Sequence, residues 1–170
     1  MKKIIVLLGA LLMSVSSFSQ KFAFVDTDYI LNNISAYKSA QEQLDKLSET
    51  WQKEIEGLYT EIDKMYKKYQ SEKVLLTEEM KKKREDEIMT REKEAKDLQK
   101  KYFGQEGALY KKRDELVRPI QDEVYKAIKE LAVDGGYSVI FDSSSGASMI
   151  YTDPKFDKSD AVLQKLGYKN

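Results

Sequence analysis

The chain of 170 residues contains no cysteine and no histidine. Without cysteine there can be no disulfide and no lipid anchor on a cysteine thiol. Without either residue type the chain cannot build Ser-His-Asp triads, Cys-His dyads, His- or Cys-based zinc sites or haem ligation. Only carboxylate, lysine or tyrosine chemistry remains. The composition therefore argues against an enzyme, and we predict no catalytic residue and no cofactor.

A recognisable metal-binding motif is also missing. Asp153, Asp157 and Asp160 could be considered calcium ligands, since hard cations need several carboxylate oxygens. Their spacing does not fit an EF-hand loop, and capping of short helices accounts for two of the three. We therefore predict helix caps at two of these positions and no metal site.

Neither sign of charge is in excess, because 29 Lys and Arg face 29 Asp and Glu. No global basic surplus indicates a nucleic-acid partner. Two local basic clusters stand at residues 81–84 and 111–113, the first near the tip of the hairpin predicted below. We interpret both as solvated helix faces with acidic neighbours, in preference to contacts with anionic lipid.

Long apolar runs are absent, with one short exception at the N-terminus. Basic residues at positions 2 and 3 precede an apolar stretch over residues 4–13, and Ser17 and Ser19 occupy the small-residue places of a cleavage site. This pattern predicts a signal peptide over residues 1–19, cleaved near Ser19/Gln20, and an exported, soluble protein. The run is too short to span a membrane. The alternative interpretation is an N-terminal anchor helix.

Two amphipathic stretches dominate residues 35–116 and predict a long antiparallel coiled-coil hairpin, here called the arm. The first helix is expected from residue 36 to about residue 72, about 55 Å at 1.5 Å per residue, and the second continues to about residue 133. A two-helix hairpin cannot bury its apolar stripe completely, so we expect self-association or binding of another molecule. The predicted hairpin seam repeats at seven-residue steps and consists of Leu44, Leu47, Trp51, Ile55, Leu58, Ile62, Met65, Ile88, Ala95, Tyr102, Leu109 and Leu116.

Four further aromatic residues each follow a seam residue by one position, namely Tyr59, Tyr66, Phe103 and Tyr110. Each is rotated about 100° from the seam, which widens the apolar stripe on one side. Tyrosine suits weak, sequence-tolerant contact because its ring is apolar and its hydroxyl stays hydrated. One interpretation is that these rings contact other polypeptides. The other is that they broaden the hairpin's own interface.

Four residues weaken the continuity of the predicted helices: Gly57, Gly104, Gly107 and Pro119. Each glycine costs about 1 kcal/mol relative to alanine, and an interior proline about 3 kcal/mol. Arms that bend are one interpretation, and close approach of the helices at the glycines is the other. For Pro119 we favour a fixed kink where the arm meets the rest of the chain.

The flanking segments, residues 20–34 and 117–170, are expected to form a small β-rich body. Strands are predicted at residues 21–28, 137–142 and 147–151, with a short connection at 30–31 and a last helix over 161–166. Three strands and one short helix are too little for an independent core. We therefore expect an α+β chain that forms an oligomer through this body, with contributions from Phe22, Phe24, Val139, Phe141 and Ile150.

Several segments together resemble the Skp/OmpH family of periplasmic chaperones. The signal peptide opens directly into Phe-Ala-Phe-Val-Asp, a long charged hairpin follows, and Pro119-Ile120 lies near the base of the returning helix. Further along stand Gly136-Tyr137, the segments 139–142 and 150–151, and residues 157–163. The resemblance implies a periplasmic homotrimer whose arms enclose a cavity. It also implies that the protein holds unfolded outer-membrane proteins without ATP.

One departure from that family concerns charge. Familiar members are markedly basic, whereas this chain is neutral, so contact with a membrane surface or lipopolysaccharide is expected to be weak. The competing function is a structural coiled-coil spacer or adaptor of the cell envelope. A spacer would have uniform heptads and no spare aromatic residues, and the glycines and the off-seam rings argue against it.

Overall fold

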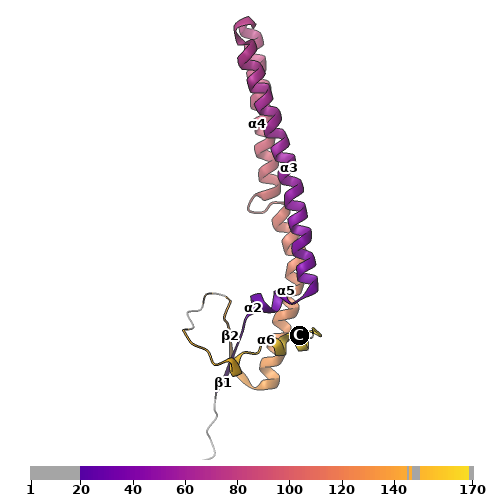
Figure 1. Ribbon diagram of the computed structural model, residues 1–170, viewed down its shortest axis with the longest axis vertical. Helices are drawn as coiled ribbons and strands as arrows, with labels where there is room; N and C mark the ends of the chain where they lie inside the picture. Colours follow the sequence, from indigo (N-terminus) through magenta and orange to yellow (C-terminus); the bar gives the residue numbers. More distant parts are fainter. Residues whose placement is uncertain (1–19, 145, 147–149, 169–170) are drawn as a thin grey trace, which may run out of the picture. The chain divides into compact units, whose positions relative to one another are not determined.

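The computed structural model describes residues 20–144, 146 and 150–168 (Figure 1). The predicted signal peptide, residues 1–19, lies outside this part of the chain. The described residues form two compact units. One combines the residues up to Leu31 with those from Val124 onward, and the other comprises Asn32–Glu123. No helix within the described residues is long and apolar enough to cross a membrane.

The second unit is built on two long helices, α3 (Ser35–Glu72) and α4 (Glu78–Phe103). The bounds of α3 confirm the predicted first helix. Figure 1 shows α4 running along α3. Tyr69 near the end of α3 donates its hydroxyl to Glu85 near the start of α4, whereas Tyr102 at the end of α4 donates to Glu54 at 2.9 Å. The end of α3 therefore lies beside the start of α4, and the two helices are antiparallel.

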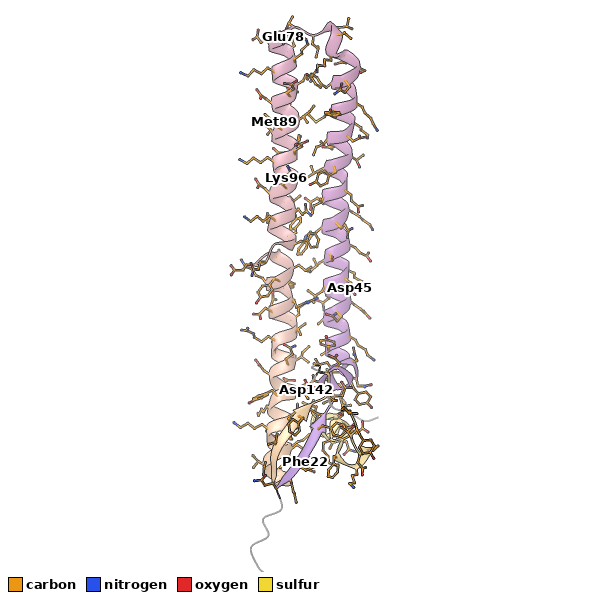
Figure 2. The ribbon with its side chains drawn as sticks, turned by 90° about the vertical axis from the view of Figure 1, so that its left-hand side faces the viewer. Phe22, Asp45, Glu78, Met89, Lys96 and Asp142 are labelled. Atoms are coloured by element: carbon orange, nitrogen blue, oxygen red, sulfur yellow. The ribbon has the colours of Figure 1, made fainter. Side chains whose placement is uncertain are left out.

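A short 3-10 helix, η2 (Lys73–Leu75), connects α3 to α4. Thr77 then caps α4, because its hydroxyl accepts the backbone N–H of Met80 at 3.3 Å. An N-cap side chain satisfies one of the backbone donors that the first helical turn leaves unpaired. Figure 2 shows Glu78, the first residue of α4, beside this connection.

The returning leg is two helices, which corrects the single second helix expected from the sequence. After α4 ends at Phe103, the chain turns and α5 begins at Ala108 and runs to Gly135. Gly107 donates to the carbonyl of Gly104 at 2.8 Å, which closes the turn. A Cβ on Gly107 would lie 2.7 Å from the Tyr102 carbonyl oxygen, so the turn requires glycine for its close backbone approach. Pro119 lies inside α5, where its missing N–H removes one helical hydrogen bond.

Two apolar clusters fill the space between the helices of the second unit. One lies between α3 and α4 and contains Ile62, Tyr69, Ile88 and Ala95. The other joins the start of α3 to α5 through Ala40, Leu44 and Val117. Burial of these side chains, at about 25 cal/mol per Å² of apolar surface, drives the pairing of otherwise charged helices.

The first unit contains a two-stranded sheet in which β1 (Lys21–Val25) pairs in parallel with β2 (Tyr137–Asp142). The bounds of β2 confirm the prediction for that strand. The other edge of β1 is occupied by the segment around Lys158, whose N–H donates to the Phe24 carbonyl at 2.9 Å. Helix α6 (Ser159–Lys165) follows, and Lys165 pairs with Asp134 of α5 at 2.8 Å.

Two predicted strands need correction. The first strand ends at Val25, because Asp26 accepts the N–H of Tyr29 at 2.9 Å and starts helix α2 (Thr27–Asn32), in place of a connection at 30–31. The return strand at 147–151 is not formed by its described residues Ile150 and Tyr151, while residues 147–149 lie outside the described part. A strand needs a neighbour for its backbone hydrogen bonds, and residues 157–158 already cover the open edge of β1.

Candidate functional site

The residues expected to form the hairpin seam lie on the inner sides of α3, α4 and α5. None of the twelve is exposed. Leu44, Ile55, Ile62, Ile88 and Ala95 are buried, and the remaining seven are half-buried. Trp51 stacks on Tyr102 with ring centroids 4.6 Å apart and an interplanar angle of 7°. An offset aromatic pair of this kind adds about 0.5–1.5 kcal/mol beyond the burial of its area.

The four off-seam aromatic residues are all exposed, at 42% for Tyr59, 52% for Tyr66, 37% for Phe103 and 56% for Tyr110. Each follows a seam residue by one position and is therefore rotated by the same angle about its own helix. Because the two legs are antiparallel, equal rotations in the chain direction turn both sets toward the same side of the pair. The four rings therefore share one side of the second unit, here called the aromatic face.

Met89 belongs to the same face but was missed in the sequence. It follows the buried Ile88 just as Tyr59 follows Leu58, and it is 59% exposed. The signal for it was present in the heptad pattern. We considered only aromatic side chains at that position, although methionine is the more adaptable apolar contact residue.

The opposite side of the pair is charged. A groove along α4 is lined by residues from Glu79 to Glu94 and by Met65 of α3. Glu87 and Glu94 precede the seam residues Ile88 and Ala95 by one position, which turns them away from the aromatic face. Arg84 pairs with Glu87 at 3.1 Å and Arg91 with Glu94 at 2.9 Å. On this side, here called the charged face, charged side chains therefore pair with one another.

A second exposed apolar surface lies on the sheet of the first unit. The register pairs Phe22 with Val139 and Phe24 with Phe141, so these four side chains share one face of the sheet. Phe22, Val139 and Phe141 are each about half exposed, and Phe24 is half-buried. Phe22 stacks on Phe156 at 5.2 Å. We call these four strand residues the sheet face; Ile150, the fifth residue expected in the body, is fully exposed outside any strand.

An apolar pocket of about 300 Å³ adjoins the sheet face. Its walls include Phe22, Phe24, Phe141, Tyr151 and Phe156. The opposite face of the sheet carries the buried Ala23 and Val25. One side of the sheet is therefore covered within its own chain and the other is left open.

The polar groups of the first unit form local turns and caps. Although burial raises the pKa of Asp142, hydrogen bonds from Thr27 and Ser144 outweigh that effect and hold the pKa below its ordinary value. Asp157 accepts the N–H of Ser159 at 2.9 Å, and Asp153 accepts that of Lys155 at 3.1 Å. The Asp153 carboxylate therefore caps the short 3-10 helix Pro154–Phe156. Asp157 instead precedes the N-cap residue of α6, Lys158, and binds the first backbone N–H of that helix. No group of three acidic residues suited to a metal ion occurs in the described part of the chain.

Comparisons with known proteins place these features in a family. Residues 21–166 match the family described as outer membrane protein (OmpH-like). An uncharacterized protein of Aquifex aeolicus (strain VF5) is 31% identical over 150 residues, which cover 88% of each chain. The fold is similar to a crystal structure from Caulobacter crescentus CB15, described as a candidate OmpH-like outer membrane chaperone. The TM-score is 0.67 at 13% identity, over 86% of this chain and 83% of that one. The chain therefore belongs to the OmpH-like family.

Proposed function

We propose that the protein is a chaperone, specifically an ATP-independent periplasmic holdase. It binds unfolded outer-membrane β-barrel proteins and prevents their aggregation before insertion. Membership of the OmpH-like family and the fold similarity to a candidate outer membrane chaperone support a chaperone role. In this proposal the second unit is the arm and the first unit is the oligomerisation body.

The aromatic face is the observation that carries the proposal. Its four rings and Met89 remain exposed although the seam residue one position before each is buried or half-buried. Apolar side chains exposed on one side only are characteristic of a contact surface. A tyrosine ring whose hydroxyl stays hydrated, or a phenylalanine ring that is only partly exposed, gives weak contacts that do not depend on the client sequence. An unfolded barrel protein offers alternating apolar side chains of the kind such a surface can hold.

The sheet face supports assembly of several copies. A two-stranded sheet with one open apolar face is not a stable independent unit, and Phe22, Val139 and Phe141 together leave a contiguous apolar patch. A second and third copy would cover it. We propose a homotrimer, as the resemblance to Skp/OmpH chaperones implies, with the arms of the three copies around one cavity.

Suppression of aggregation tests the holding function. An unfolded outer-membrane protein is diluted from urea, and light scattering is recorded with increasing amounts of the mature chain. We expect stoichiometric suppression without ATP. Failure at a several-fold excess of the chain would refute the chaperone function and favour the alternative, a structural spacer of the cell envelope with one fixed partner.

Two matched variants test the aromatic face. Changing Tyr59, Tyr66, Phe103 and Tyr110 to Ser should weaken holding about tenfold or more while the oligomer persists. Changing Lys83, Glu87, Arg91 and Glu94 to Ser places the same number of serines on the charged face and should leave holding intact. Equal loss in both variants, or loss of the oligomer in the first, would overturn the assignment of the aromatic face.

Mass measurement tests the assembly. Sedimentation equilibrium of the mature chain should give a trimer, and the double variant Val139→Ser/Phe141→Ser should dissociate it at micromolar concentration. A monomeric parent chain would contradict the proposed oligomer. The same result would leave open whether the arm of one chain alone suppresses aggregation, which the scattering assay reports separately.

A further inference from the structure

The aromatic face repeats with the period of a helix. Tyr59 and Tyr66 stand seven residues apart on α3, and Phe103 and Tyr110 stand seven apart on the returning leg. Seven residues of helix span about 10.5 Å. An extended strand places the side chains of one side about 6.4–6.8 Å apart, so these do not coincide with successive rings. A helix with an apolar residue in every heptad advances by the same step as the rings and stays in register along the whole face.

Charged side chains of opposite sign border the rings. Positions three before or four after a ring on the same helix are rotated about 40–60° further from the seam. On α3 these positions are acidic and repeat by heptads, whereas on α4 between Met89 and Phe103 they are basic. Asp45 and Lys96 occupy ring positions that hold no ring, and they carry the same signs as their neighbours (Figure 2). The acidic border consists of Asp45, Glu49, Glu56 and Asp63, and the basic border of Lys93, Lys96 and Lys100.

Most of this border charge is not neutralised locally. All seven side chains are exposed, and Asp63 pairs with Lys67 at 2.7 Å. The other six take part in none of the ion pairs found within the described residues. A ligand between the borders therefore meets negative charge along α3 and positive charge along α4. The complementary surface has an apolar stripe, a basic edge toward α3 and an acidic edge toward α4.

We propose that the aromatic face binds one amphipathic α-helix, with an apolar residue in each heptad, basic residues along one edge and acidic residues along the other. The borders also set the direction of this helix, because turning it end for end exchanges its two edges. This inference goes beyond the holding of unfolded barrel proteins, since it adds a second class of partner: exported polypeptides that contain such helices. It rests on the proposed use of the aromatic face as a contact surface.

Ring positions and charge favour a single helix over the arm of a second copy. Trp51 stacks on Tyr102, which sets Gln52 of α3 across from Phe103 of α4. Two parallel arms packed face to face about a twofold axis would place Phe103 of one copy over Gln52 of the other. In two antiparallel arms α3 would lie over α3, and the acidic borders would repel each other. A single helix has neither conflict, because its own edges can match both borders.

A designed peptide tests the class of partner. It has about four heptads with one stripe of Leu, Lys along one edge and Glu along the other, and it contains no Trp. The peptide is labelled, kept at nanomolar concentration, and titrated with the mature chain while fluorescence anisotropy is recorded. We expect saturable binding. A peptide of the same composition with Leu at every second position should bind about tenfold or more weakly.

Two further readouts report on the conformation and the place of binding. Circular dichroism of the mixture should show more helix than the sum of the separate components, because an isolated helix of this length is marginal in water. Trp51 is the only Trp of the chain, and its ring lies 6.3 Å from that of Phe103. Its emission should therefore change when the unlabelled peptide covers Phe103.

Variants separate the rings from the charges. Changing the four rings of the aromatic face to Ser should weaken peptide binding about tenfold or more, whereas the four-serine variant of the charged face should bind as the parent chain does. Lys93→Glu/Lys96→Glu/Lys100→Glu makes both borders acidic. It should weaken binding of the mixed-charge peptide about fivefold and strengthen that of a peptide with Lys along both edges by a similar factor. The three lysines are exposed, so this variant should keep the parent helix content.

Three outcomes would overturn the inference: no saturable binding, equal binding of the peptide with Leu at every second position, or binding that the ring variant leaves unchanged. A particle larger than the trimer that the helical peptide breaks up would also overturn it, since a second arm would then be the partner. The aggregation assay keeps the two proposals separate. Suppression of aggregation without peptide binding refutes only the helical partner, and peptide binding without suppression refutes only the holding function.

Discussion

The steric requirement for glycine in the turn between α4 and α5 can be tested by comparing two glycines, one crowded by backbone atoms and one with free space around it. Gly107 is buried, and a Cβ added there would lie 2.7 Å from the Tyr102 carbonyl oxygen and 2.9 Å from the Gly104 nitrogen. Gly57 lies in the interior of α3 with nothing within 4 Å of the added atom. We predict that Gly107→Ala destabilises the protein and that Gly57→Ala stabilises it.

The magnitudes follow from the neighbouring atoms. Both substitutions reduce the freedom of the unfolded chain, which favours folding by about 0.4–1 kcal/mol. In α3 that gain is kept, because alanine is the better helix former by about 1 kcal/mol. At Gly107 the contacts are with backbone atoms, and such overpacking costs about 1–3 kcal/mol. Because the gain from the unfolded chain is common to both variants, their free energies of unfolding should differ by about 1–3 kcal/mol, the overpacking cost at Gly107.

Urea unfolding measures this difference. All proteins are compared at one protomer concentration, because assembly would otherwise shift the midpoints. With a slope of about 2 kcal/mol per M, the midpoints of the two variants should be about 0.5–1.5 M apart. Trp51 fluorescence reports on the turn, because this ring stacks on Tyr102, and circular dichroism reports on all helices. A Gly107→Ala protein as stable as Gly57→Ala would refute the steric argument for the turn.

Three further predictions concern single contacts. The hydrogen bond to Glu85 is the main cause that raises the pKa of Tyr69 to about 12; the stabilisation from this contact should persist up to about pH 10 and disappear toward pH 12. Absorbance at 295 nm of the parent chain minus Tyr69→Phe should therefore titrate near pH 12, and a midpoint near 10 would contradict it. Ser159 is buried, and its hydroxyl accepts the Asp26 N–H at 2.9 Å. Ser159→Ala should cost about 1–3 kcal/mol, measured by urea unfolding, and no change would show that another group replaces that bond. Ile62→Ala should cost about 2–5 kcal/mol by opening a cavity beside Ala95, whereas Tyr59→Ala on the exposed face should cost under about 0.5 kcal/mol; equal costs would contradict the division between seam and face.

The long helix α3 was predictable because its apolar residues repeat without a break at helical spacing over 38 residues. The interruption after Phe103 was not. Tyr102 and Leu109 stand seven residues apart across the turn, and both face the seam. The loop at Gly104–Gly107 thus preserves the heptad step while the helix ends, so periodicity alone cannot reveal it. The close backbone approaches at Gly104 and Gly107 distinguish a turn there from a tolerated helical glycine.

The pairing of the strands could not be predicted from the sequence, for a different reason. The alternation in residues 137–142 is local and gave β2 its bounds, but parallel pairing with β1 is a contact between the two ends of the chain. For the end of the first strand, a local signal existed. Asp26 can cap a helix, and its bond to the Tyr29 N–H ends the strand at Val25. We gave the apolar run more weight than the cap.

The same long-range pairing has a consequence for the order in which the protein can form. β1 is made first, and its partner β2 follows about 110 residues later. At 5–20 residues per second, synthesis leaves Phe22 and Phe24 without their partner strand for about 5–20 s. The α3–α4 pair, whose ends are joined by a few residues, can close within that time. The protein that we propose as a chaperone would thus itself expose an unpaired apolar strand during its synthesis. A chaperone that assists its folding should therefore bind this N-terminal segment.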